Sequence, residues 1–372
     1  MAWSPEDHRT DAERATQPVP GRSGQSRLAT RRSILRRVSL VLDHLDKRFG
    51  ETVALDGLTF TVPAGQVFGF LGANGAGKTT TMRIVLGVLE ADRGTVSWNG
   101  TDSRALPRST WGYLPEERGL YPRMTVIDQL VYFATLYGVP ADRARRDALH
   151  WLVRFRVPEL GERRAEELSK GNQQKIQLIA AVLHDPQVLL MDEPFTGLDP
   201  VNVALLREAF LELRDQGRTL IFSTHQMETV EALCESIAIV DRGRVVVGGP
   251  VKDVRRSAGR QLVRLAVEGD HRLAWVNDVP GARILRPGIE RTEIELDPGV
   301  EPDVILAAAV SRGARVTHFE VGDASLEQIF IDHVGRPPDE ELHLAPDPDD
   351  EPAEGDSAPA SAAARATDEP AA

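Results

Sequence analysis

Residues 66–80 read Gln-Val-Phe-Gly-Phe-Leu-Gly72-Ala-Asn-Gly-Ala-Gly77-Lys78-Thr79-Thr80, and this stretch decides the fold. The mostly apolar run 66–71 predicts a short buried strand, and apolar residues spaced as on one face of a helix follow it. The second half matches G-x-x-x-x-G-K-[ST] between a strand and a helix, the context that a phosphate-binding loop requires. The sequence therefore predicts an α/β protein that binds a nucleoside triphosphate.

Each part of this predicted loop has a chemical task. Its glycines let successive backbone N–H groups turn inward around phosphate oxygens. The positive end of the following helix, expected over 80–89, adds to the attraction. Lys78 is expected to reach the β- and γ-phosphates, and the Thr79 hydroxyl to ligate Mg²⁺. The predicted nucleotide contacts are Gly72, Ala73, Asn74, Gly75, Ala76, Gly77, Lys78, Thr79 and Thr80.

A second apolar run ends in two carboxylates. Residues 188–191 read Val-Leu-Leu-Met and stop at Asp192 and Glu193. This places both side chains at the end of a strand, where open α/β sheets bind ligands. Asp192 suits Mg²⁺, and Glu193 suits a general base that polarises the attacking water.

A third apolar run, 218–223, leads to Thr224 and His225. An imidazole at the end of this strand can hydrogen-bond the γ-phosphate and hold the water and Glu193 in register. We therefore expect Glu193, His225 and Lys78 to be the catalytic residues, acting on ATP with Mg²⁺ as cofactor.

Further motifs, by their order and spacing, resemble those of the ATP-binding subunits of ATP-binding cassette (ABC) transporters. Residues 168–173, Leu-Ser-Lys-Gly-Asn-Gln, are similar to the family signature, and residues 196–199, Thr-Gly-Leu-Asp, are similar to its D-loop. His225 matches the switch histidine, Phe49 matches the aromatic residue that stacks on adenine, and residues 112–116 lie where the family has its Q-loop. The resemblance implies further site residues: Ser169, Lys170, Gly171 and Asn172 in the signature, acting in trans, Asp199 in the D-loop, and Glu116 as a metal ligand beside Thr79 and Asp192.

Three positions depart from the family pattern. Lys170 stands where glycine is usual in the signature, and Asn172 stands where glutamine is usual. Glu116 stands where the Q-loop has glutamine, so a carboxylate replaces a neutral amide. Residues 113–121 together with the signature resemble a branch that serves ABC-2-type exporters, including sodium-efflux and drug-resistance systems.

The resemblance also implies an architecture and partners. We expect an ABC-type P-loop cassette over 39–250, with a RecA-like core, an antiparallel β subdomain and a helical subdomain over about 116–170. In the family, two copies close head to tail around two ATP, so a homodimer or a heterodimer with a similar ATPase is expected. The dimer drives a separate transmembrane permease, which would hold this chain at the cytoplasmic face of the cell membrane.

The helical region and the C-terminal third show their own patterns. Apolar stripes over 127–136 and 149–155 predict two helices whose apolar residues are mostly core. After Pro250 the apolar spacing changes and predicts a small α+β domain over 251–334. Its expected strands cover 261–267, 282–286, 290–296 and 315–321, and its expected helices cover 304–310 and 325–333.

Composition excludes several classes of protein. The 372 residues carry a net charge of −12, without the basic footprint of a nucleic-acid binder. A single cysteine excludes a disulfide partner within the chain, and no run approaches the ~18 apolar residues of a membrane span. Residues 1–38 form an expected disordered basic arm, and residues 335–372 an expected disordered acidic tail. Two alternatives stay open: a non-transport ABC ATPase in translation or DNA maintenance, and a nucleotide-binding regulator without turnover, against which Glu193 and His225 argue.

Overall fold

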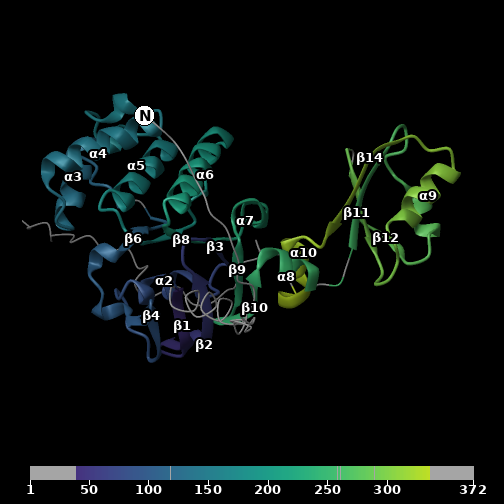
Figure 1. Ribbon diagram of the computed structural model, residues 1–372, viewed down its shortest axis with the longest axis horizontal. Coiled ribbons are helices and arrows are strands. Elements are labelled where there is room, and N and C mark those ends of the chain that lie inside the picture. The colour runs from purple at the N-terminus through teal and green to yellow at the C-terminus, as the bar shows by residue number, and fades with distance from the viewer. Residues whose placement is uncertain (1–38, 118, 258, 260, 289, 336–372) are drawn as a thin grey trace, which may run out of the picture. The chain divides into compact units, whose positions relative to one another are not determined.

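A computed structural model describes residues 39–335 of the chain apart from 118, 258, 260 and 289 (Figure 1). The expected N-terminal arm and all but the first residue of the expected acidic tail lie outside the described residues. Within the described part, the strands form three sheets: one six-stranded sheet and two four-stranded sheets. Among these residues no helix combines the length and the apolar character needed to cross a bilayer.

The six-stranded sheet carries the phosphate loop and has the order β10-β9-β3-β8-β7-β6. Its strands run parallel except β10, which is antiparallel to β9. Every residue of β3, β7 and β8 is buried, as expected for parallel strands covered on both faces. The bounds are β3 (Val67–Leu71), β6 (Trp111–Leu114), β7 (Val188–Asp192), β8 (Thr219–Thr224), β9 (Ser236–Asp241) and β10 (Arg244–Pro250).

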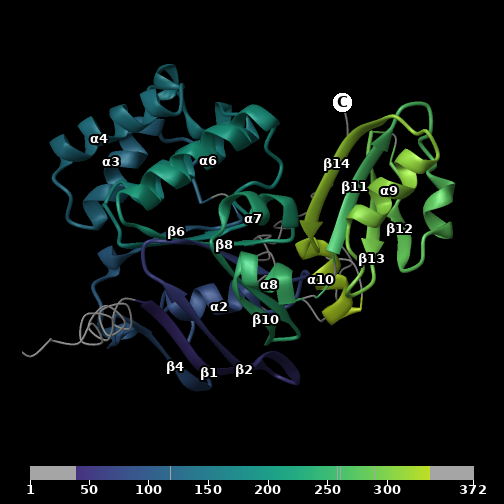
Figure 2. The ribbon, with the colours of Figure 1, turned by 45° about the vertical axis from the view of Figure 1, so that its right-hand side comes forward.

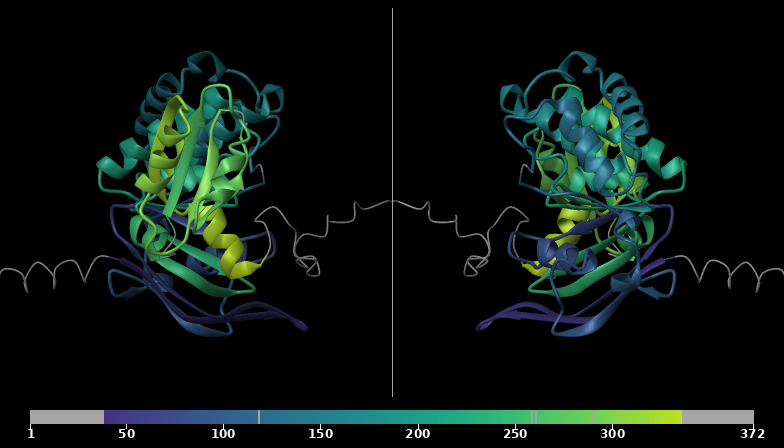
Figure 3. Two further views of the ribbon diagram at one scale, coloured as in Figure 1. Left: turned by 90° about the vertical axis from the view of Figure 1, so that its right-hand side faces the viewer. Right: turned by 90° about the vertical axis from the view of Figure 1, so that its left-hand side faces the viewer.

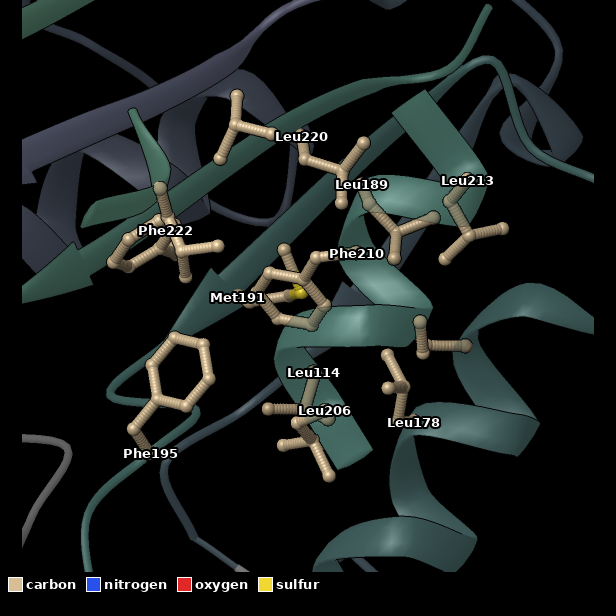
Figure 4. Packing of buried hydrophobic residues seen from close by; sticks show 14 of the residues in the cluster. Leu114, Leu178, Leu189, Met191, Phe195, Leu206, Phe210, Leu213, Leu220 and Phe222 are labelled. Atoms are coloured by element: carbon tan, nitrogen blue, oxygen red, sulfur yellow. The ribbon is translucent and has the colours of Figure 1, made fainter. Parts of the chain in front are cut away.

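Side chains alternate along β3 and enter two separate cores. Val67 and Leu71 pack in a large cluster with helices, whereas Phe68 and Phe70 pack in a second cluster with the antiparallel sheet. Figure 4 shows part of the first core, where Phe195, Phe210 and neighbouring aliphatic side chains fill the space between the sheet and the helices. Apolar layers on both faces leave only the strand ends for polar chemistry.

The second core belongs to a four-stranded antiparallel sheet of order β2-β1-β4-β5. This sheet and the helix that follows the phosphate loop therefore cover one face of the six-stranded sheet, and the helices of the first core cover the other face (Figure 3). The bounds are β1 (Ser39–Phe49), β2 (Thr52–Pro63), β4 (Arg93–Trp98) and β5 (Thr101–Asp102).

The helix after the phosphate loop, α2 (Lys78–Val85), starts two residues earlier and ends four residues earlier than its apolar spacing predicts. Its end is set by Gly87, whose φ of +65° is a left-handed conformation that glycine adopts without strain. There Gly87 N–H donates to Ile84 O at 2.9 Å and Val88 N–H donates to Arg83 O at 2.9 Å. Leu89 fits the apolar spacing of the helix but lies beyond its end.

The helical region contains α3 (Val126–Leu136), α4 (Ala141–Arg154) and α5 (Lys170–Val182), and α6 (Pro200–Asp215) follows the D-loop. Helices α3 and α4 confirm the two predicted stripes, but not every member is core. Leu136 is 64% exposed and Val153 is 62% exposed, and Leu149, one turn before Val153, is also exposed. Buried Ala148 and Leu152 show that the neighbouring face of α4 packs inward.

The C-terminal sheet is antiparallel with the order β12-β13-β11-β14, and α9 (Asp303–Ser311) packs in its own buried cluster. The predicted strands and helices occur with small shifts, and a further helix, α8 (Val251–Ser257), precedes them. The last helix, α10 (Leu326–Val334), packs with α7 (Met227–Leu233) in the helix-side core of the six-stranded sheet. The bounds are β11 (Gln261–Val267), β12 (Ala282–Arg286), β13 (Thr292–Leu296) and β14 (Val316–Asp323).

Candidate active site

The phosphate loop leaves β3 and is packed tightly against its neighbours. A Cβ added at Gly72 would lie 2.6 Å from Val240 O, and one added at Gly77 would lie 2.7 Å from Ala54 O. Gly77 also has a φ of +101°, a conformation that favours glycine. These positions therefore need glycine for reasons of space, and their backbone fixes the shape of the loop.

The remaining loop residues fall into two groups. Ala73, Ala76 and Thr80 are buried beneath the loop, whereas Asn74 and Gly75 are exposed at its tip. The tip is where a phosphate group can approach the backbone N–H groups.

Lys78 is buried at the base of this loop, at 7% exposure. Its Nζ donates hydrogen bonds to Gly72 O at 2.8 Å and to Ala73 O at 3.2 Å. Burial lowers the pKa of Lys78, while the charges of Glu193, Asp192 and, more weakly, Glu116 oppose this effect. A buried ammonium group binds phosphate oxygens more strongly than backbone carbonyl oxygens, because phosphate oxygens carry full negative charge.

Thr79 and Asp192, two of the residues expected to ligate Mg²⁺, lie within hydrogen-bond distance of each other. Thr79 Oγ1 donates to Asp192 Oδ2 at 2.7 Å, and Ser223 Oγ donates to Asp192 Oδ1. No group of three or more His, Cys, Asp or Glu side chains that could hold a metal ion occurs in the described part of the chain. A hydroxyl and one carboxylate suit Mg²⁺, which binds to one or two carboxylates and takes its other ligands from phosphates and water.

Glu193 directly follows β7 in a left-handed conformation, with a φ of +45°. Its N–H lies 3.2 Å from both Ser223 O and Ser223 Oγ, and these acceptors hold the turn. A non-glycine residue keeps this conformation only where its surroundings compensate for the strain, and such residues gather at functional sites.

Two neighbours hold the Glu193 carboxylate in place. His225 Nδ1 lies 2.9 Å from Glu193 Oε1, and Thr196 Oγ1 donates to Glu193 Oε2 at 3.0 Å. Because a carboxylate only accepts hydrogen bonds, the His225 proton is assigned to Nδ1. Each carboxylate oxygen thus has one donor and retains lone pairs for a water molecule. The side chain is 7% exposed, so such a water would be largely shielded from bulk solvent.

Two of the three departures from the family pattern, Glu116 and Lys170, line the same cavity. It has a volume of about 220 Å³, and Glu193 and Gln174 also contribute to its wall together with residues 196–198. Desolvation, followed by the charges of Asp192 and Glu193, raises the pKa of the Glu116 carboxyl. The cavity wall therefore combines two carboxyl groups, those of Glu116 and Glu193, with Lys170, whose charge is opposite.

The signature forms the first turn of α5, which begins at Lys170. Ser169 is the N-cap, and its Oγ accepts from Asn172 N–H at 3.4 Å. A Cβ at Gly171 would lie 2.8 Å from Asn202 Nδ2, so α6 approaches this turn closely. The positive end of α5 thus lies at the signature, where it can attract an anion.

Asp199 caps the next helix in the same way. Its Oδ1 accepts from Val201 N–H at 3.0 Å and from Asn202 N–H at 3.1 Å, which starts α6. The Asn202 hydrogen bond is the main reason that the pKa of Asp199 is lowered. Within one chain Asp199 therefore fixes α6 beside the signature turn.

Phe49 lies at the end of β1, opposite Thr52 of β2. Lys47 Nζ lies 5.4 Å from the centroid of its half-buried ring. Two residues beyond Thr52, Ala54 contacts the phosphate loop at Gly77. The β1–β2 hairpin thus links Phe49 to the loop, and stacking on adenine stays a prediction.

Three residues of the site carry no assigned role in the sequence analysis. Ser223 bonds Asp192, Thr196 bonds Glu193, and Tyr113 lies close enough to Asp192 to be affected by its charge. Burial, then that charge, raises the pKa of Tyr113 to about 12. Ser223 stands one residue before Thr224-His225, so a search for every polar residue at a strand end finds it.

Comparisons with known proteins agree with this geometry. Residues 55–196 match the family described as ABC transporter, and residues 249–334 match the C-terminal domain described as ATP-binding protein DrrA1-3-like. An uncharacterized ABC transporter ATP-binding protein of Bacillus subtilis is 44% identical over 296 residues, which cover 80% of this chain and 98% of the relative. These matches do not favour an ABC ATPase that acts outside transport.

One further relative and one solved structure extend the comparison. The Nod factor export ATP-binding protein I of Ralstonia nicotianae is 34% identical over 315 residues, covering 80% of this chain and 94% of the relative. A solved structure titled as the ATP binding subunit of an ABC transporter has a TM-score of 0.56 and 33% identity. It covers 59% of this chain and 93% of that chain.

Proposed function

This chain belongs to the ABC transporter ATP-binding proteins, and we propose that it powers an exporter by closing as a dimer around ATP and Mg²⁺. Hydrolysis of ATP to drive transport is the activity of the family. The observation that carries the proposal for this chain is the arrangement at Glu193. Its carboxylate is held by His225 and Thr196 next to the Thr79–Asp192 pair.

In the proposed binding step, phosphate oxygens replace the carbonyl partners of Lys78. Its Nζ already lies at the base of the loop, so only the hydrogen-bond acceptors change and the side chain keeps its conformation. Thr79 and Asp192 would hold Mg²⁺, and the bound ion would neutralise part of the phosphate charge. Their present hydrogen bond brings the two oxygens together before the ion binds.

In the proposed hydrolytic step, Glu193 accepts a proton from the attacking water. The two hydrogen bonds to its carboxylate fix its direction, so little reorganisation is needed when the proton moves. His225 acts together with Glu193: its Nδ1 binds the Glu193 carboxylate, while the rest of the ring can contact the γ-phosphate. Glu193 is thus the catalytic base, and His225 positions it.

A second copy of the site is needed on the other side of the phosphate. The first turn of α5, with Ser169, Lys170, Gly171 and Asn172, presents a helix N-terminus and an exposed lysine. In the proposed dimer this turn contacts the γ-phosphate held by the partner chain and spreads its developing charge. A homodimer, or a heterodimer with a similar ATPase, provides two such pockets.

The proposed permease contact lies on the helical region. Tyr121 and Tyr132 are exposed and form an aromatic group with Phe133, with Tyr121 and Phe133 ring centroids 5.7 Å apart. Leu136 continues this exposed apolar surface along α3. We propose that a cytoplasmic helix of the permease docks there, which would hold the chain at the cytoplasmic face of the membrane. The Ralstonia relative is named for export, which supports this direction of transport.

The test is Glu193→Gln, which keeps the size of the side chain and removes its proton affinity. With Mg²⁺ and ATP, turnover should fall on the order of 100-fold or more. ATP should still bind, and a dimer should accumulate in size-exclusion chromatography. Wild-type turnover in this variant would refute the role of Glu193 as base. Glu117→Gln, next to Glu116 and outside the proposed roles, is the matched control and should leave turnover unchanged.

A further inference from the structure

Helix α7 starts two residues after His225 and is bonded directly to the C-terminal part of the chain. Glu231, on α7, accepts a hydrogen bond at Oε1 from Leu326 N–H at 2.6 Å. Leu326 is the first residue of α10, so the carboxylate also lies at the positive end of that helix. Figure 2 shows α7, α8 and α10 next to one another.

Arg255, on α8, completes a polar node with Glu231. It donates from Nε to Ala324 O at 2.9 Å and from Nη2 to Asp323 O at 3.1 Å. Its Nη1 lies 3.9 Å from Glu231 Oε2. Both side chains are about three-quarters buried, at 24% and 23% exposure, so solvent weakens these contacts only in part. The node therefore joins α7, α8 and the turn between β14 and α10.

Apolar packing supports the node on both sides of α7. Leu326, Ile329 and Phe330 of α10 are at most 1% exposed and belong to the same cluster as Val230. On the other side, Val230 packs on β3: a Cβ at Gly69 would lie 2.9 Å from its Cγ1. Helix α7 is thus held between the strand that leads to the phosphate loop and the last helix of the C-terminal region.

The chain enters and leaves the C-terminal sheet through segments that take part in this node, and Arg286 of β12 adds an ion pair to Glu327 of α10 at 2.7 Å. Helix α8 precedes β11, and α10 follows β14. A shift of either connection would act on Glu231 and hence on α7. Helix α7 begins only two residues after His225, whose Nδ1 lies 2.9 Å from Glu193 Oε1.

We propose that Glu231 is a positioning residue for hydrolysis, through which α8 and α10 keep His225 in register with Glu193. The C-terminal region is then a working part of the ATPase and not an inert extension. This inference rests on the proposed role of His225. It predicts that loss of the Glu231 contacts slows hydrolysis and leaves ATP binding almost unchanged.

The experiment compares Glu231→Ala with Glu231→Gln in the full chain, using Mg²⁺ and ATP. Alanine removes the acceptor for Leu326 N–H, and kcat should fall roughly three- to tenfold, with KM for ATP changed less than about twofold. Glutamine keeps an acceptor oxygen and should restore most of the lost kcat. A purely structural role would instead lower the melting temperature and the folded fraction, with kcat per folded molecule unchanged. That result would overturn the proposal.

A matched control is Arg264→Ala. It breaks ion pairs to Glu293 and Glu320 inside the C-terminal sheet, away from the node, and should leave kcat unchanged. An equal loss of kcat in this variant would show a general effect of damage to the sheet, and would also overturn the proposal.

A double-mutant cycle with His225→Ala separates this inference from the proposed function. If Glu231 acts through His225, adding Glu231→Ala to His225→Ala should cause no further loss of kcat. A second, multiplicative loss would overturn the positioning role while leaving His225 in the hydrolytic site. Full turnover in His225→Ala alone would instead refute the proposed role of His225, and the inference with it.

Discussion

The six-stranded sheet and the C-terminal sheet keep their charged side chains in different places. In the first, β3, β7 and β8 are buried along their whole length, and the charged groups of the site lie at the end of β7 (Asp192) or beyond the strand ends (Lys78 and Glu193). In the second, charges lie on the strands themselves and pair across them. Arg264 of β11 bonds Glu293 at 3.0 Å and Glu320 at 3.2 Å on its two neighbours.

The difference follows from what covers each sheet. Parallel strands with apolar layers on both faces have no polar face, so their charges gather at one edge. At that edge Lys78 donates to backbone carbonyls and not to a carboxylate, which leaves its charge for a ligand. An antiparallel sheet with one apolar cluster has an open face, where opposite charges neutralise one another. Charges of the first kind should therefore govern chemistry, and charges of the second kind should govern only local stability.

The largest effect is expected at Lys78, one of the charged groups at the edge of the six-stranded sheet. Lys78→Ala removes the only ammonium group that the loop directs at a phosphate, so ATP affinity should fall on the order of 100-fold. Equilibrium binding of a fluorescent ATP analogue measures this. The matched control is Lys252→Ala, which removes an exposed lysine of α8 and should not change affinity. Unchanged binding in Lys78→Ala would break the assignment of the loop.

A smaller effect is expected one step away from the reacting atoms. Thr196→Val keeps the shape of the side chain but removes the donor to Glu193 Oε2, so the carboxylate should lose part of its fixed direction. We expect kcat to fall about three- to tenfold with little change in KM. Thr196→Ser retains a hydroxyl and should recover most of the rate. If valine and serine behave alike, the hydrogen bond does not position the base.

The sequence predicts three strands of the six-stranded sheet well because each of them is a mostly apolar run. Strands expected at 66–71, 188–191 and 218–223 occur within one residue at each end. The polar residues that end these runs are also correctly placed at one edge, since parallel strands share a direction. Pairing at that edge was harder to predict, because no spacing rule joins Ser223 to Asp192 over 31 positions.

Helix ends and exposed apolar residues show where the pattern fails. Leu89 fits the helical spacing, but Gly87 ends α2 before it, so backbone conformation outweighs hydrophobic period. Leu136 and Val153 extend apolar stripes and yet are exposed, because periodicity alone does not show which apolar residue lacks a partner. The common cavity of Glu116 and Lys170 depends on tertiary contact between the Q-loop and α5, which lie more than fifty positions apart.

The smallest effect is expected at Glu320, on the open face of the C-terminal sheet. Arg264 from β11, His318 from β14 and Arg291, just before β13, surround its carboxylate at 3.2, 3.3 and 3.9 Å. Burial alone would raise the pKa of Glu320, but hydrogen bonds and charges from His318 and Arg264 outweigh it and hold the pKa below the ordinary 4.5.

A lowered carboxyl pKa means that the folded state favours the charged form, so its contribution to stability is present near neutral pH and is lost as pH falls through the folded pKa. Glu320→Gln should therefore speed amide hydrogen exchange in β11 and β14 near neutral pH by about twofold, as expected for a half-exposed ion pair. The difference from the wild type should shrink in strongly acidic solution, where both side chains are neutral. ATP turnover should stay at the wild-type rate, because Glu320 pairs with Arg264, His318 and Arg291 within the C-terminal region and not with Glu231 or Arg255. A clear loss of turnover would mean that the open face of the C-terminal sheet communicates with the ATP site by a second route, and the separation between chemical and structural charges would fail.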